Sequence, residues 1–279
     1  MLSLSSRQGC FRPFLKWAGG KSKLIEQFVP FFPEKFERYY EPFLGGGAVF
    51  FYLCDRFPRV PKFISDVNAD LINTYLCVRD DVELVISLLD KHQLNHTKEY
   101  YYQVRAVKHD DNFERAARLI YLNKTCFNGL YRENSKGEFN VPLGKYKNPN
   151  ICNTELLRCA AIALRNTDIS VKHFIDVLDW AETEQDFVYF DPPYHPLSST
   201  SNFTAYSRDF FGENEQVKLR DTFKKLSERG VKVMLSNSDC AFIRKLYSDF
   251  KTHEISAARA INSKTEKRGK ITELLVTSY

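Results

Sequence analysis

The feature that most constrains the fold is a short run of apolar and aromatic residues, DFVYF at 186–190, followed at once by Asp-Pro-Pro-Tyr at 191–194. Aromatic and β-branched residues over such a length predict a buried strand. Asp191 then falls at the end of the strand. The two prolines hold φ near about −65° and have no backbone N–H to donate. The pattern predicts a stiff turn that presents a carboxylate and carbonyl groups without local donors.

Strand and helix patterns alternate around this run. Strands are expected in RYYEPF, KFISDVN, DISVKH and VKVMLSN, and helices over 213–229 and 241–250. HEISA and ITELLVTSY near the end are expected to pair as an antiparallel hairpin. This order predicts an α/β fold with a doubly wound, mostly parallel sheet. In such a sheet ligands bind beyond the carboxyl ends of the strands.

Residues 70–165 have a different pattern. Apolar positions recur at helical spacing through LINTYLCVRD, VELVISLL, EYYYQVRAV and ERAARLIYL, and then give way to FNGLYRENSKGEFNVPLGKYKNPN. This pattern predicts a helical insertion that carries a β-hairpin. The domain division that follows is 1–69 with 166–279, and 70–165.

Composition excludes few classes of protein. The chain has 279 residues and a net charge of +5, which alone does not identify a nucleic-acid binder. No stretch reaches the roughly 20 apolar residues of a membrane span, and no signal peptide is recognised, so a cytoplasmic protein is expected. Seven scattered cysteines without a C-x-x-C pair favour reduced thiols. His92 and His96 lack the glutamate of a zinc hydrolase, so no metal is expected.

The Asp-Pro-Pro-Tyr turn suits a planar group that carries an NH2. The Asp191 carboxylate and the Pro192 carbonyl can each accept one amine hydrogen, and Tyr194 can stack on the ring. The alternative is a proline-stiffened turn with its tyrosine packed on the core.

A second pattern is EPFLGGGAVF, in which three glycines let the backbone approach a ligand after a strand. Asp66 follows Gly45 by 21 residues at the end of the next expected strand. An acid at about that distance can bind a ribose hydroxyl pair. Because G-x-G-x-x-G fails at Phe50, a nicotinamide is less favoured than another adenosine-containing ligand. KWAGGKSKL has Leu15 where a phosphate-binding loop needs glycine, which argues against an ATPase.

Taken in order, KWAGGK, EPFLGGGAVF, ISDVN, YLNKTCFNGLYRENSKGEFNVPLGKYKNP, FDPPYHPLSSTSNFTAYS and RGKITELLVTSY resemble the Dam-type DNA adenine-N6 methyltransferases over about 14–279. The order of motifs is that of the alpha-type permutation. The resemblance implies a Rossmann-like fold that binds S-adenosylmethionine, and a monomer that acts on double-stranded DNA without a metal. It also implies that the insertion is the target-recognition domain and that the target sequence is GATC.

The resemblance also implies roles for individual residues. The cofactor would contact Trp17, Lys21, Phe43, Gly45, Gly47, Asp66 and Asp191. The flipped adenine would lie against Asp191, Pro192, Pro193 and Tyr194. DNA would contact Lys16, Phe127, Asn128, Leu130, Arg132, Asn134, Pro142 and Tyr146. These side-chain types suit the roles, because arginine grips a guanine edge and an apolar side chain can wedge into an opened stack.

Several alternatives stay open at this level. The amine could belong to cytosine, glutamine or an RNA base, or the chain could bind DNA without catalysis. Phe127 stands where many relatives of the family have tyrosine. Basic residues within 259–270 suit phosphate contacts or a solvated turn equally well. The segment 198–207 is expected to order over the flipped base or the DNA when substrate binds.

Overall fold

The structure is a computed structural model that describes residues 10–197, 211–258 and 270–279. Within these ranges seven strands form one mixed sheet in the order β3-β2-β1-β4-β5-β7-β6. This confirms the predicted α/β class. Contacts group the described chain into two compact units: residues 10–22 with 44–172, and residues 23–43 with 173–197, 211–258 and 270–279.

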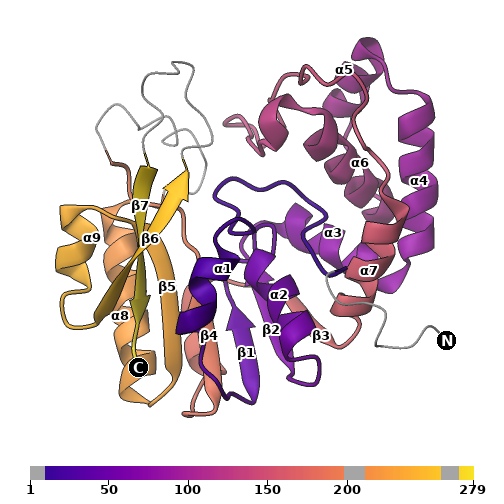
Figure 1. Cartoon of the computed structure of the whole chain (residues 1–279). Helices are drawn as coiled ribbons and strands as arrows, with labels where there is room; N and C mark the ends of the chain where they lie inside the picture. The colour runs from indigo at the N-terminus through magenta and orange to yellow at the C-terminus, as the bar shows by residue number, and fades with distance from the viewer. Residues whose placement is uncertain (1–9, 198–210, 259–269) are drawn as a thin grey trace. The chain divides into compact units, whose positions relative to one another are not determined.

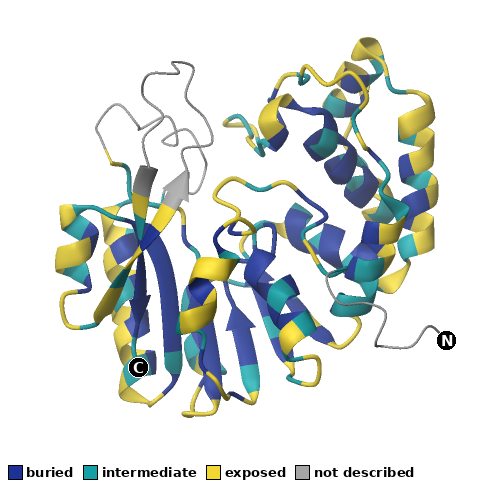
Figure 2. Ribbon diagram, in the orientation of Figure 1, coloured by how far each residue is buried: buried dark blue, intermediate teal, exposed yellow. Residues whose placement is uncertain are grey.

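The second unit contains the strand that ends in Asp191. Strands β1 (Arg38–Glu41), β4 (Asp186–Phe190) and β5 (Lys232–Ser238) are parallel. Strand β7 (Lys270–Thr277) is antiparallel to β5 and also to β6 (Lys251–Ala258), as the predicted terminal hairpin requires (Figure 1). Every residue of β4 is buried, which explains its apolar sequence (Figure 2).

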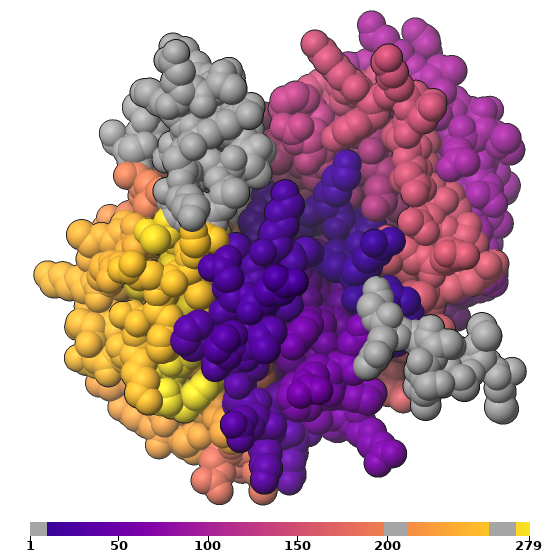
Figure 3. Space-filling model, in the orientation of Figure 1, coloured from indigo at the N-terminus to yellow at the C-terminus, as the bar shows by residue number. Residues whose placement is uncertain are grey.

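Helical segments cover both faces of these strands. Helix α8 (Glu213–Glu228) packs on β5 and on the 3-10 helix η4 (Phe174–Asp179). The other face carries α1 (Ile25–Phe28) and η2 (Val29–Phe31), tied down by Gln27, whose amide pairs with both backbone groups of Ser256. In the space-filling view the C-terminal part, orange to yellow, forms one continuous surface (Figure 3). The helix expected over 241–250 is α9 (Ala241–Leu246), shorter than predicted.

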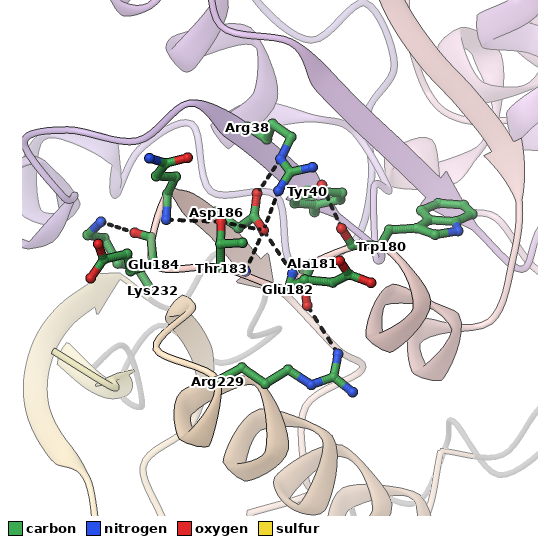
Figure 4. A network of polar contacts seen from close by, with 11 residues as sticks. Arg38, Tyr40, Trp180, Ala181, Glu182, Thr183, Glu184, Asp186, Arg229 and Lys232 are labelled. Carbon is green, nitrogen blue, oxygen red and sulfur yellow. Dashed lines mark hydrogen bonds and ion pairs between the residues drawn. The ribbon is translucent and has the colours of Figure 1, made fainter.

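The amino end of β4 is fixed by a buried carboxylate (Figure 4). Asp186 is fully buried and accepts Nε of Arg38 at 2.6 Å and the backbone N–H of Thr183 at 3.0 Å. This hydrogen bond raises the pKa of Arg38. Charged hydrogen bonds of this kind are among the stronger ones in proteins. The strand is therefore fixed at the end opposite Asp191.

The first unit contains the parallel pair β2 (Lys62–Asp66) and β3 (Thr167–Val171) with helix α2 (Ala48–Arg56). The predicted helical insertion is present. Its helices are α3 (Ala69–Asp80), α4 (Val82–Leu94), α5 (Lys98–Ala106), α6 (Asn112–Thr125) and α7 (Thr154–Leu164).

Polar side chains begin each of these five helices. The N-cap residues, each accepting a hydrogen bond from a backbone N–H of the first turn, are Asn68, Asp81, Thr97, Asp111 and Asn153. Such caps satisfy donors that the helix leaves unpaired. No helix in the described residues is long and apolar enough to cross a membrane.

The expected hairpin after α6 is mostly irregular. It begins with the 3-10 helix η3 (Phe127–Gly129) and keeps two isolated antiparallel bridges, Cys126 with Leu143 and Glu133 with Phe139. The two units group residues 10–22 and 44–66 with these helices, whereas the predicted domain boundary separates them. Compactness does not test a functional boundary, so the role of 70–165 in DNA recognition stays a prediction.

Candidate functional site

Asp191 lies at the carboxyl end of β4, where its carboxylate is held by the neighbouring strand. Oγ of Ser236 on β5 donates to Oδ1 of Asp191 at 2.9 Å. The hydroxyl of Tyr189 lies 2.8 Å from the same Ser236 Oγ. Both Tyr189 and Ser236 are buried, while Asp191 is partly accessible. The carboxylate is thus oriented from inside the protein and remains partly accessible.

Tyr194 is fixed through its hydroxyl, which donates to Oε2 of Glu273 on β7 at 2.6 Å. Burial, together with the negative charges of Asp191 and Glu273, raises the pKa of Tyr194 well above its usual value. The phenol therefore stays protonated and keeps this hydrogen bond. A ring held at its outer atom presents a fixed face for stacking.

Two buried side-chain amides hold the proline turn. Nε2 of Gln216 on α8 donates to the carbonyl of Pro193 at 3.0 Å, and Oε1 of Gln216 accepts from Asn237 at 2.9 Å. Oδ1 of Asn237 in turn accepts the backbone N–H of His195 at 3.2 Å. Gln216 and Asn237 are both fully buried. Among the described residues no hydrogen bond reaches the Pro192 carbonyl, which leaves that oxygen able to accept a ligand hydrogen.

The glycine turn and the acid predicted to follow it meet in the first unit. Oδ2 of Asp66 accepts the N–H of Gly45 at 3.1 Å, and Oδ1 accepts the N–H of Asn68 at 3.0 Å. Burial raises the pKa of Asp66, and these two hydrogen bonds act against the rise. Gly45 and Gly47 have φ of +48° and +68°, the left-handed region in which glycine is favoured.

Trp17 and Lys21 lie beside this turn. A Cβ on Gly45 would approach Cδ1 of Trp17 to 2.7 Å, so the indole lies directly against the turn. Tyr131 stacks on Trp17 with ring centroids 5.4 Å apart. Lys21 is buried, and its ammonium donates to the carbonyl of Gly19.

Phe43, the other residue predicted to bind the cofactor, lies in the second unit within an aromatic cluster. It stacks on Phe174 at 5.3 Å and meets Phe190 and Phe211 edge-on.

Most of the predicted DNA-reading residues lie in the segment after α6. Phe127 is 48% exposed, unusually accessible for a phenylalanine, and follows Cys126, the residue that caps the end of α6. Asn128 has φ of +57°, which is uncommon outside glycine. Pro142 accepts the N–H of Phe127 at 2.9 Å, which joins the two limbs of the segment. Leu130 is partly exposed.

The structure also brings Lys16 to this segment. Its ammonium lies 4.5 Å from the ring centroid of Tyr146, and Nζ lies 3.5 Å from the Tyr146 hydroxyl. Both backbone groups of Lys16 bind the side chain of Asn123 on α6, at 2.9 and 2.7 Å. Asn123 was not predicted, because its importance lies in a contact across 107 residues of sequence.

Arg132 and Asn134 differ in how far their side chains are engaged in hydrogen bonds within the protein. Arg132 is exposed, and its Nε donates to Oδ1 of Asn140 at 2.6 Å. This contact fixes the guanidinium plane. Asn134 instead closes a turn: Oδ1 accepts the N–H groups of Lys136 and Glu138, and Nδ2 donates to the Glu138 carboxylate at 2.9 Å. In this structure Asn134 shapes the segment.

Lys124 is a candidate that the sequence reasoning missed. It lies on α6 close to Lys16 and Arg12, and burial together with these two positive charges lowers its pKa to about 8. Because no acidic group in the described part of the chain offsets the shift of Lys124, these three cations favour a bound anion. The segments 198–207 and 259–269, for which substrate or phosphate contacts were predicted, lie outside the described residues.

A carboxylate followed by a stiff proline turn at the end of β4 and, in the other unit, an acid bound to a glycine turn after β1 are the two features that the comparison with known proteins addresses. The chain belongs to the D12 class N6 adenine-specific DNA methyltransferase family, which matches residues 17–261.

Curated relatives agree with this family. The type II methyltransferase M1.LlaDCHI of Lactococcus lactis subsp. cremoris is 46% identical over 96% of this chain and 95% of its own length. The type II methyltransferase M.MjaIII of Methanocaldococcus jannaschii is 44% identical over 96% and 99%. The DNA adenine methylase of Escherichia coli K12 is 38% identical over 95% and 94%.

Proposed function

We propose that this chain transfers the methyl group of S-adenosylmethionine to N6 of adenine in double-stranded DNA, within GATC, after the base has been flipped out of the helix. One arrangement carries the proposal: Asp191 is oriented by Ser236 beside a Pro192 carbonyl that no described donor occupies. Two acceptors at one turn suit the two hydrogens of an exocyclic amine. Family membership makes that amine adenine N6.

The residues of the glycine turn fit an adenosine-containing cofactor. A carboxylate offers roughly four acceptor positions, and Asp66 uses two of them for backbone N–H groups. The others suit the ribose hydroxyls. Lys21 is proposed to pair with the cofactor's carboxylate and Trp17 to lie against its ring, with Phe43, Gly45 and Gly47 completing the site. S-adenosylmethionine supplies an electrophilic methyl group on a sulfonium.

Asp191 acts in this proposal as a hydrogen-bond acceptor. The lone pair of an adenine amine is delocalised into the ring, which makes it a poor nucleophile. Accepting one hydrogen at Asp191 and the other at the Pro192 carbonyl favours a pyramidal nitrogen whose lone pair is directed at the methyl. Tyr194 stacks on the base to hold it there. Orientation and fixed dipoles then supply the rate, and no metal is required.

Residues 70–165 are proposed to recognise the target. Arg132 would bind a guanine edge in the major groove, which is the commonest specific arginine contact. Phe127, exposed at the end of α6, would fill the space left by the extruded base. Asn128, Leu130, Pro142 and Tyr146 would contact neighbouring bases, with Lys16 beside them. The Escherichia coli relative is named a DNA adenine methylase.

Two other readings make different predictions. A cytosine-N4 or RNA enzyme would methylate another substrate with the same turn. A DNA-binding relative without catalysis would show no transfer, and the oriented Asp191 and Tyr194 argue against it. The names of the two type II relatives raise a further possibility for this chain, a partnership with an endonuclease. We propose a cytoplasmic enzyme that acts as a monomer.

The test is to incubate unmethylated plasmid with the purified protein and labelled S-adenosylmethionine, and to map N6-methyladenine by sequencing. We expect modification of adenine in GATC only. Modification confined to another sequence would refute the target, and no labelled adenine would refute the reaction. The Asp191→Ala variant is expected to bind DNA nearly as well as the parent and to transfer no methyl group. Turnover close to that of the parent would refute the role of Asp191.

A further inference from the structure

A thiol and an imidazole meet just beyond the proline turn. Sγ of Cys240 lies 3.7 Å from Nδ1 of His195, the residue that follows Tyr194 in sequence. Oγ of Ser238 donates to the same sulfur at 3.8 Å. Cys240 is partly accessible. A thiol in contact with a nitrogen base and a hydroxyl donor has both a proton acceptor and a group that stabilises the thiolate.

The imidazole is held in this position from two further sides. Its ring stacks on Phe242 with centroids 4.7 Å apart. Its other nitrogen, Nε2, lies 3.6 Å from the carboxylate of Glu213. A carboxylate near Nε2 favours the tautomer with its proton on that nitrogen, which leaves Nδ1 as an acceptor for the thiol proton. Cys240, His195 and Glu213 thus have the order of a nucleophile, a base and an orienting acid.

Four of the other cysteines in the parts of the chain that the structure describes are less suited to this chemistry. Cys54, Cys77 and Cys126 are buried. Burial raises the pKa of Cys77, Cys126 and Cys152 to about 11, which disfavours their thiolates. Cys159 on α7 is, like Cys240, partly accessible and serves as an internal reference.

We propose that Cys240 is a covalent modification site that forms a mixed disulfide with small-molecule disulfides, with His195 as the base. The thiol proton passes from Sγ to Nδ1 of His195. The thiolate then bonds to one sulfur of the small disulfide while the S–S bond breaks. The departing thiolate takes the electron pair of that bond and the proton from His195. One disulfide and one thiol give one mixed disulfide and one thiol, so no other oxidant is needed.

A modification at this position has a short path to the proline turn. The backbone N–H of His195 and that of Ser238 both bind Oδ1 of Asn237, at 3.2 and 2.8 Å. Asn237 also holds Gln216, the donor to the Pro193 carbonyl. A group attached to Cys240 must displace the imidazole that lies against the sulfur. Modification is therefore expected to disturb the turn that carries Asp191 and to slow methyl transfer.

The experiment exposes the folded, reduced protein to oxidised glutathione and follows each cysteine by intact mass and peptide mapping. We expect Cys240 to gain a glutathionyl group first and to lose it on treatment with dithiothreitol. The His195→Phe variant keeps an aromatic ring for Phe242 to stack on but has no base. It is expected to slow the modification of Cys240 by about 100-fold or more, the low end of what a positioned base contributes. Modification of Cys159 should be unchanged in the same sample.

Methyl transfer is measured in parallel. Glutathione treatment is expected to slow the parent protein, while Cys240→Ser keeps its activity with and without treatment. Modification of Cys159 or Cys152 before Cys240, or an unchanged Cys240 rate in His195→Phe, would overturn the proposal. The mass measurement needs no methyltransferase activity, so its result is separate from that of the proposed function.

Discussion

Replacing Ser236 with alanine tests whether the buried hydroxyl orients the carboxylate of Asp191 for the proposed reaction. The substitution removes the donor 2.9 Å from Asp191 and leaves the hydroxyl of Tyr189 buried without the partner that lies 2.8 Å away. A hydrogen bond to a charged group contributes about 1.5–3 kcal/mol. If that contribution is needed in the transition state, kcat falls by roughly 10- to 150-fold.

The assay is a single-turnover measurement with enzyme in excess over a duplex that contains one target adenine. Rate at saturation reports the chemical step, while DNA and cofactor affinities are measured by titration. We expect both affinities to stay within about twofold, because neither ligand contacts Ser236 in the proposed complex. A free energy of unfolding lowered by about 1–2 kcal/mol is expected as well, since a buried hydroxyl loses its partner.

Two further variants separate orientation from general damage. Tyr189→Phe removes the hydroxyl but keeps the hydrogen bond from Ser236 to Asp191, so its single-turnover rate should lie close to that of the parent. Asp191→Ala should show no turnover. A Ser236→Ala rate within twofold of the parent, in a protein that binds both ligands, would refute the argument that this hydroxyl orients Asp191.

Three other changes follow from the geometry. Lys124 has a pKa lowered to about 8, below the usual lysine value of about 10.4, so the free chain gains stability as pH rises between these values. A DNA phosphate would favour the charged form of Lys124, so DNA binding at fixed salt should weaken by up to about tenfold per pH unit above 8. Lys124→Arg should remove this pH dependence. An equal pH slope of DNA affinity in both proteins would contradict the prediction. Gly45→Ala places a Cβ 2.7 Å from Trp17 at a φ of +48°, and it should lower the free energy of unfolding measured by urea titration by about 1–2 kcal/mol. Gly46→Ala, whose Cβ has its nearest contact at 3.3 Å, should lower the free energy of unfolding by less. Arg132→Ala should reduce discrimination at one guanine by about 1–3 kcal/mol, read from methylation of duplexes with single base changes, and unchanged discrimination would exclude Arg132 as the reader.

The sequence predicts the elements whose pattern is local. The strand before Asp191 is recognisable in the sequence because its burial, which covers all five residues, selects a nearly continuous apolar and aromatic run. The terminal hairpin follows from two short apolar runs that pair antiparallel in the structure. The helices of 70–165 are visible because their apolar faces repeat at helical spacing. The hairpin after α6 is less regular than predicted, because the side chain of Asn134 accepts the N–H groups of Lys136 and Glu138 and Asn128 adopts a left-handed backbone conformation.

The residues around the turn could not be predicted, because neighbouring strands of the sheet bring together side chains that are far apart in sequence. Ser236 stands 45 residues after the carboxylate that it binds, and Glu273 stands 79 residues after Tyr194. A serine in VKVMLSN and a glutamate in ITELLVTSY have no local signal that separates them from ordinary strand residues. Their importance is visible only from the register of β5 with β7 and from the burial of Ser236.

The two prolines show most clearly what the sequence leaves undecided. Each lacks an N–H, and each has a carbonyl that could accept an amine hydrogen, so the pattern alone does not decide between them. Gln216 distinguishes the two carbonyls, because its buried amide already donates a hydrogen bond to the carbonyl of Pro193. Asn237 fixes that amide in one orientation by accepting two backbone N–H groups and donating to Gln216. In the proposed reaction the oxygen of Pro192, next to Asp191, is then the second acceptor for the substrate amine, and this assignment depends on the Gln216–Asn237 pair, which no motif contains.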